Sequence, residues 1–349
     1  MARFPEVMAV GLAALLAACG GDGRTPLVLY SPHGRDQLEL LEHAFEAHHP
    51  EIDVRWLDMG SQEVLDRIRS ERANPQADVW FGGPTTLFDR GIGDSLLAPY
   101  RPDWAASVGP RGVGPGDLYY PAYRTPAVIA YNADAVPAAE APHDWDDVLD
   151  PKWTDKVLIR DPVASGTMRA IWGLVLVRSI RATGDTAQGM AWLRRLDRQT
   201  KAYALNPAIL MERLSRREGL VTLWDLPDVL IDKAKGLPLG YTFPTSGTVV
   251  IDDGIGLVRG ARHPEAAKAF IDFVGSVEGQ LLAARKVFRL PARDDLPADS
   301  IPAWVGEVER SMVVADMDWD LLTRDGSAWM RYWDQHVRGS GHRESPRAP

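Results

Sequence analysis

Four short segments rich in serine, threonine and glycine each precede an expected helix, and they carry the groups best suited to bind an anion. They are Ser31–Gly34, Gly60-Ser61, Gly82-Gly83-Pro84 and Ser165-Gly166-Thr167. N–H groups at a helix start are free to donate and carry partial positive charge, so an anion is stabilised there. Ordinary helix capping and turn formation would use the same residue types, and this alternative stays open. The candidate ligand-binding residues from these segments are Ser31, His33, Gly34, Ser61, Gly82, Gly83, Ser165, Gly166 and Thr167.

Three further residues could contact the other end of a ligand. Asp225 could accept hydrogen bonds from sugar hydroxyls or pair with an amine, and Trp224 could stack on a sugar face or an ammonium group. Tyr123 precedes an expected crossing between two structural units. A buried tryptophan beside a structural aspartate is the alternative for the first pair. Together these residues suggest a polar or zwitterionic ligand.

The elements that must position these residues alternate between strand and helix in the first part of the chain. Apolar or alternating runs predict strands over Leu27–Tyr30, Ile52–Leu57 and Ala77–Phe81. Leu38, Leu41 and Phe45 have helical spacing within residues 37–48. A β-α-β-α-β-α order implies a mainly parallel sheet covered by helices, and ligands of such sheets bind beyond the C-terminal strand ends.

A second α/β unit follows a predicted β-like segment, Ala127–Tyr131. Its predicted strands are Val157–Arg160 and Leu220–Leu223, with a helix over Arg169–Ile180. Tyr241–Val250 is interpreted as the segment that crosses back to the first unit. Two α/β lobes joined by more than one crossing would leave a cleft along their junction.

Composition excludes several classes of function. With 45% hydrophobic and 25% charged residues, the 349-residue chain is typical of a folded protein of about two domains. A formal net charge of −9 argues against nucleic-acid binding, which needs a basic surface. The single cysteine, Cys19, allows no intramolecular disulfide. We expect a monomer without a cofactor or a bound metal.

The N-terminus has the layout of a secretory signal. Arg3 precedes an apolar run, Met8–Ala18, that is too short to span a bilayer. Leu16-Ala17-Ala18-Cys19 resembles a bacterial lipobox, which implies cleavage before Cys19 and lipid attachment to that cysteine. We therefore expect a lipid-anchored protein at the periplasmic or extracellular face of a bacterial membrane. A cleaved signal with an incidental cysteine, or one membrane anchor, is the alternative.

Several segments, in order, resemble bacterial extracellular solute-binding proteins, the capture subunits of ABC importers. The similar segments are Leu29–His33, Ala77–Gly83, Pro151–Trp153, Arg262–Val274 and Ser276–Gln280. The most similar branch includes binders of ferric ion, phosphonates and sugar phosphates. This resemblance implies an α/β fold of the two-lobed, type II periplasmic-binding-protein kind, with a β-strand hinge, a small-molecule ligand and a membrane permease as partner.

The resemblance also suggests a division of the chain. The expected parts are a signal peptide (1–18), a lipid-anchored tether (19–25), lobe 1 (26–124 and 249–298), lobe 2 (125–248 and 299–338) and a disordered tail (339–349).

Within this branch, the residues favour a phosphonate or sugar phosphate over iron. The tyrosine pair of ferric binders maps onto Trp224-Asp225, and their first-lobe carboxylate maps near Gly83. His33 alone is a poor ligand set for Fe(III), which prefers several anionic oxygens. Ser165-Gly166-Thr167, in contrast, resembles the phosphate-contacting loop of phosphonate and sugar-phosphate binders. A ferric-ion binder of the same fold remains the alternative.

We expect a binding protein and not an enzyme. The sequence contains no Gly-x-Ser-x-Gly elbow, no phosphate-binding P-loop and no His-Glu-x-x-His helix. Catalytic groups can be scattered along a sequence, so a sensor or an enzyme on this scaffold stays a further alternative.

Overall fold

A computed structural model of the chain describes residues 23–339. The predicted signal peptide, Cys19 and all of the predicted tail except Gly339 lie outside these residues. β1 already begins at Thr25, which the sequence analysis assigned to the tether. The side chain of Arg24 forms an ion pair with Glu46 at 2.5 Å, so the described chain is held to the first lobe from this point.

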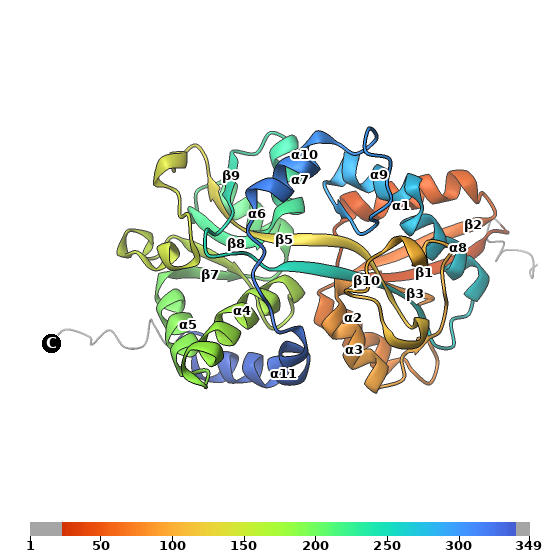
Figure 1. Cartoon of the computed structure of the whole chain (residues 1–349), viewed down its shortest axis with the longest axis horizontal. Coiled ribbons are helices and arrows are strands. Elements are labelled where there is room, and N and C mark those ends of the chain that lie inside the picture. The colour runs from red at the N-terminus through yellow and green to blue at the C-terminus, as the bar shows by residue number, and fades with distance from the viewer. Residues whose placement is uncertain (1–22, 340–349) are drawn as a thin grey trace, which may run out of the picture.

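The described residues form two α/β lobes that share one continuous sheet (Figure 1). The first lobe contains β1 (Thr25–Ser31), α1 (Arg35–His48), β2 (Ile52–Asp58), α2 (Ser61–Ser70), β3 (Val79–Pro84), α3 (Thr85–Gly93), β4 (Leu97–Ala98), α8 (Pro264–Gly275), α9 (Val277–Val287) and β11 (Leu290–Pro291). The second contains β6 (Val157–Arg160), α4 (Gly166–Thr183), α5 (Ala187–Gln199), β7 (Thr200–Ala204), α6 (Pro207–Ser215), β8 (Val221–Asp225), α7 (Leu226–Ala234), β9 (Leu239–Thr242), α10 (Ala303–Ser311) and α11 (Trp319–His336).

Two long strands, β5 (Tyr120–Asn132) and β10 (Val250–Val258), join the lobes. The strand order is β2-β1-β3-β10-β5-β8-β6-β7. Residues 120–126 of β5 pair antiparallel with β10, whereas residues 127–132 pair with β8 and β9. In Figure 1 the two strands run side by side from one lobe to the other. The return crossing is therefore β10, and the prediction that placed it at Tyr241–Val250 is wrong, because β9 ends within the second lobe at Thr242.

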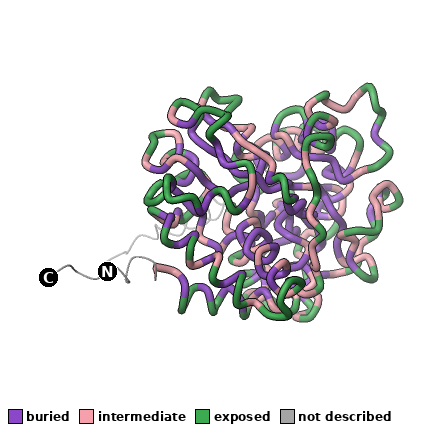
Figure 2. Tube along the Cα trace, turned by 60° about the vertical axis from the view of Figure 1, so that its left-hand side comes forward, coloured by how far each residue is buried: buried purple, intermediate pink, exposed green. Residues whose placement is uncertain are grey.

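Each lobe has its own hydrophobic core. The predicted helical face of α1 is confirmed, since Leu38, Leu41 and Phe45 are all buried. Phe45 packs edge-on against Phe270 of α8, with ring centroids 5.3 Å apart. Burial of each such side chain stabilises the fold by about 1.5–3 kcal/mol relative to exposure. In Figure 2 the buried residues gather in the interior and the exposed segments lie around the outside.

The second core is completed by the C-terminal helix, which the sequence analysis did not identify. Trp333 of α11 is fully buried and packs edge-on against Trp172 of α4, with ring centroids 6.0 Å apart. Val249, Ile251 and Leu290 also belong to this cluster. The predicted division assigns these three residues to lobe 1, although their side chains pack in the second core. The division into lobes remains a proposal.

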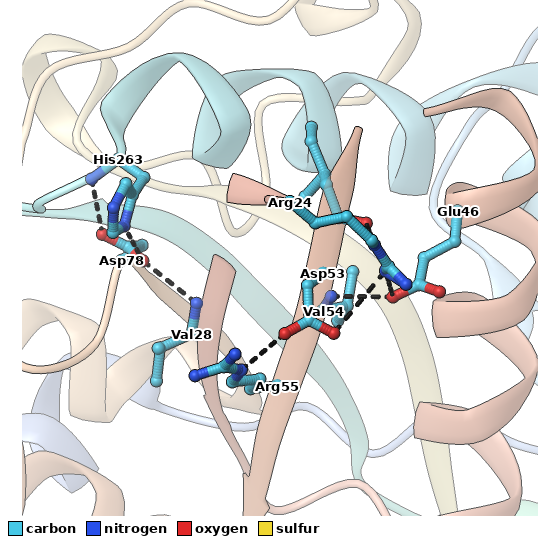
Figure 3. A network of polar contacts seen from close by, with 9 residues as sticks. Arg24, Val28, Glu46, Asp53, Val54, Arg55, Asp78 and His263 are labelled. Carbon is cyan, nitrogen blue, oxygen red and sulfur yellow. Dashed lines mark hydrogen bonds and ion pairs between the residues drawn. The ribbon is translucent and has the colours of Figure 1, made fainter. Parts of the chain in front are cut away.

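A buried aspartate fixes the position of β1, whose C-terminal end leads to the first predicted loop. Asp78 accepts hydrogen bonds from the backbone N–H groups of Val28, at 3.0 Å, and His263, at 2.9 Å (Figure 3). Hydrogen bonds to a charged group typically stabilise a fold by about 1.5–3 kcal/mol each. This carboxylate therefore ties β1 to the start of α8.

Candidate functional site

A cleft of about 960 Å³ lies between the lobes and is lined by residues of both. Parallel strands end at it, as expected for an open α/β sheet. Asp58 is the last residue of β2, Arg160 of β6 and Asp225 of β8, and all three line the cleft.

The lobes contact each other around this cleft. Lys235, which follows α7, forms an ion pair with Asp36 of α1 at 2.6 Å. The backbone N–H of Gln62 donates to the carbonyl of Ala164 at 3.3 Å. These two contacts bridge the lobes beside the cleft, and we refer to this arrangement as closed.

Eight of the twelve predicted ligand-binding residues line the cleft. They are His33, Gly34, Ser61, Gly83, Ser165, Thr167, Trp224 and Asp225. All four predicted loops and the Trp224-Asp225 pair thus converge on one cleft although they are far apart in the sequence.

The other four predicted residues do not line the cleft and make other contacts. Ser31 is fully buried, and its hydroxyl accepts a hydrogen bond from the N–H of His33 at 3.1 Å. Gly82, with a φ of 92°, lies directly against the His33 ring, where a Cβ atom would overlap it. Tyr123 is buried with its ring centroid 6.3 Å from that of His33. Gly166 packs between the lobes against Pro84 and Ser61.

Several predicted residues also have the structural roles that were considered as alternatives. Ser165 caps α4, since its Oγ accepts a hydrogen bond from the N–H of Met168 at 3.2 Å. Asp225 caps α7 in the same way, accepting from the N–H of Asp228 at 3.1 Å. A capping oxygen still has a free lone pair or, in serine, a proton to donate, so capping is compatible with ligand contact.

Arg160 is the most significant residue that the sequence analysis missed. It is only 5% exposed, lines the cleft, and has no carboxylate within ion-pair distance among residues 23–339. The neighbouring Asp161 pairs with Arg338 instead, at 2.6 Å. Burial lowers the pKa of Arg160, whereas the nearby Asp161, Glu63 and Asp58 raise it. Its place at the end of a predicted strand was the signal that could have identified it.

A second buried arginine, Arg289, lines the cleft beside the hinge strands. Its Nε donates to Gln37 Oε1 at 2.6 Å, and Nη1 donates to Thr125 Oγ1 at 3.0 Å. Thr125 in turn donates to Asp253, whose carboxylate lies 3.9 Å from Nη1. No local sequence pattern could have identified Arg289, because it follows a helix and meets Gln37 across 252 positions of the sequence.

Carboxylates lie near both arginines. Burial raises the pKa of Asp58 to about 6, and the nearby negative charge of Asp228 contributes to this increase. The positive charge of Arg160 acts in the opposite direction. Burial also raises the pKa of Asp253 to about 6, against the effect of Arg289. The pKa of Asp225 is raised well above its ordinary value, first by burial and then by Asp228. Burial in the cleft thus raises the pKa of all three carboxyl groups.

Within residues 23–339, no group of three or more His, Cys, Asp or Glu side chains is arranged to hold a metal ion. No helix in the same range is long and apolar enough to cross a bilayer.

Comparison with known proteins identifies the family. The profile of the family described as "Bacterial extracellular solute-binding protein" matches residues 27–289. A "Probable ABC transporter periplasmic-binding protein" of Sinorhizobium fredii is 27% identical over 89% of this chain and 86% of its own. A "Putative 2-aminoethylphosphonate-binding periplasmic protein" of Salmonella typhimurium is also 27% identical, over 71% of this chain and 72% of its own.

Solved structures agree with the fold. The periplasmic binding protein AfuA from Actinobacillus pleuropneumoniae, solved with fructose-6-phosphate, superposes with a TM-score of 0.78 at 23% identity, covering 92% of this chain and 100% of AfuA. The predicted two-lobed, type II periplasmic-binding-protein fold is therefore confirmed. The chain belongs to the family of bacterial extracellular solute-binding proteins, which capture solutes for ABC importers.

Proposed function

We propose that this protein captures a small solute bearing a phosphonate or phosphate group in the cleft between its lobes. The observation that carries the proposal is Arg160, a buried cation that lines the cleft without a carboxylate partner among the described residues. A buried charge is costly unless it is paired, and a ligand anion would supply the missing partner.

Neighbouring groups complete a site that we call the anion seat, defined as Ser61, Gly83, Arg160, Ser165 and Thr167. The loop after Arg160 folds back on the strand end, because the N–H of Ser165 donates to the carbonyl of Asp161 at 3.2 Å. Ser61 belongs to the other lobe, yet a Cβ on Gly166 would lie 2.9 Å from its Oγ. Hydroxyls of both lobes therefore converge near the start of α4, where the helix dipole favours negative charge.

Contacts from both lobes exist together only in the closed arrangement, so a ligand in the seat would shift the equilibrium toward closure. The relative named for 2-aminoethylphosphonate binding and the structure of AfuA with fructose-6-phosphate support a phosphorus oxyanion as the bound group. We further propose that the closed form is what the permease recognises.

Replacing both Ser165 and Thr167 with alanine is expected to weaken binding of phosphate esters or phosphonates at least tenfold, about 1.4 kcal/mol. The two substitutions remove hydroxyl donors at the start of α4 while the arginine remains. Isothermal calorimetry on ligands selected by a thermal-shift screen gives the measurement. Unchanged affinity for every phosphorus-containing ligand would reject the seat.

We also propose that Cys19, which lies outside the described residues, carries a lipid that anchors the protein to the membrane. Cys19→Ser is expected to move the protein from the membrane fraction to the soluble fraction, since the modified thiol is the attachment point. Fractionation of cells expressing both forms, with metabolic labelling by a fatty acid, gives the measurement. Membrane association of the serine variant would indicate an uncleaved anchor instead.

A further inference from the structure

A second group of polar residues lines the cleft next to the hinge strands. We call it the hinge pole and define it as Gln37, Trp224, Asp225 and Arg289. Arg289 contacts Gln37 directly and influences the pKa of Asp225. Nη1 of Arg160 instead donates to the carbonyl of Ala204 in the second lobe, at 3.4 Å. The two arginines are thus held by different lobes, Arg289 by the first and Arg160 by the second, and we treat the hinge pole and the anion seat as two parts of one cleft.

The hinge pole contains both donors and acceptors that have no protein partner. Gln37 is 1% exposed, and its Nε2 makes no hydrogen bond because its Oε1 is turned to Arg289. Nη2 of Arg289 has no hydrogen-bond partner among the described residues, while Nε and Nη1 are both engaged. Asp225 uses Oδ1 to cap α7, which leaves Oδ2 to accept a hydrogen bond from a ligand. Unpaired buried polar atoms are costly, so this arrangement indicates a ligand that pairs with them.

Hydroxyl groups match this pattern and an ammonium group does not. A hydroxyl both donates and accepts, so neighbouring hydroxyls can serve Gln37, Arg289 and Asp225 together. An ammonium group only donates, so it could pair with Asp225 but would leave the N–H donors of Gln37 and Arg289 without an acceptor. Trp224 lines the same region with its indole N–H fixed on Asp228 at 2.8 Å, so its ring has a set orientation against which a sugar face can pack.

The size of the cleft agrees with a ligand of this kind. Its volume of about 960 Å³ is near the upper end of the roughly 300–1,000 Å³ usual for small-molecule sites. A two-carbon aminophosphonate would fill only a small part of a cleft of this size, whereas a sugar phosphate has a larger body that can contact both lobes.

We propose that the solute is a phosphorylated polyol or sugar, with its anionic group in the anion seat and its hydroxyls at the hinge pole. This inference rests on the proposed function, because it takes the anion seat as given and assigns the remainder of the ligand.

Calorimetry with the purified mature protein tests the assignment. The probes are hexose 6-phosphates, glycerol 3-phosphate, 2-aminoethylphosphonate and inorganic phosphate. We expect at least one hexose phosphate or glycerol 3-phosphate to bind at least tenfold more tightly than both 2-aminoethylphosphonate and inorganic phosphate. Tighter binding of 2-aminoethylphosphonate than of every polyol phosphate would overturn the inference and leave the anion seat intact. No binding of any of these probes would overturn the proposed function as well.

The variant Asp225→Asn tests the hinge pole independently of the anion seat. Asparagine retains the helix cap and the side-chain shape but replaces the second carboxyl oxygen, which faces the ligand, with an NH₂ group that can only donate. We expect at least a tenfold loss of affinity for the best polyol phosphate and less than a twofold change for inorganic phosphate. Asp318→Asn is the matched control, because Asp318 caps α11 through the N–H of Leu321 outside the cleft. Equal losses for both ligands would contradict the assignment, and Arg289→Lys provides a second, independent variant with the same expected split.

Discussion

Replacing Gly166 with valine is expected to reduce ligand affinity at least tenfold without unfolding the protein. Gly166 is the first residue of α4 and belongs to the second lobe, whereas its closest neighbours, Pro84 and Ser61, belong to the first. A Cβ at this position would lie 2.8 Å from Pro84 Cγ and 2.9 Å from Ser61 Oγ. Overpacking of this kind costs about 1–3 kcal/mol, and here only the closed state bears the cost.

The apparent affinity is proportional to the population of the closed state. A side chain that sterically hinders closure therefore lowers the measured affinity. The measurement is calorimetric affinity, with small-angle scattering to follow closure and urea unfolding to follow stability. Gly93→Val is the matched control, since a Cβ at Gly93 meets no atom within 4 Å. Affinity equal to that of the unmodified protein would show that the lobes need not approach at Gly166 to hold the ligand.

Replacing Arg160 with glutamine is expected to lower affinity for the phosphate- or phosphonate-bearing solute by about 10- to 150-fold. Hydrogen bonds to charged groups contribute about 1.5–3 kcal/mol, and the anion seat has no second arginine among its members. Stability of the unliganded protein should stay the same or increase, because Arg160 has no carboxylate partner among the described residues and its burial is unfavourable.

This opposite effect on affinity and stability distinguishes a ligand-binding arginine from a structural one. Calorimetry gives the affinity and urea unfolding gives the free energy of unfolding. Arg178→Gln is the control, because Arg178 is bound to Ser246 within the second lobe and does not line the cleft. A marked loss of stability with little change in affinity would assign Arg160 a structural role.

Closure and recognition are linked through the hinge. Arg289 contacts Thr125 of β5, and Thr125 in turn contacts Asp253 of β10, so one side chain joins the cleft to both crossing strands. A ligand held by Arg289 would therefore act on the strands that must bend for the lobes to move.

The sequence by itself determined the local elements and the family. The spacing of Leu38, Leu41 and Phe45 encodes a helical face because apolar side chains must share one side to be buried. The runs at Leu27–Tyr30 and Val157–Arg160 encode buried strands for a similar reason. Glycine and serine before each helix also indicated which loops could face a ligand, and Ser61, Gly83, Ser165 and Thr167 do line the cleft.

Only the tertiary structure decided which polar groups face that cleft and which lie beneath it. Ser31 and Tyr123 have suitable side chains, yet neighbouring elements cover them. Arg289 became a cleft residue through contacts with Gln37, 252 positions away, and Lys235 meets Asp36 across 199 positions. Periodicity reports which face of a single element is buried, whereas a cleft between lobes depends on how separate elements approach one another, and no local pattern records that approach.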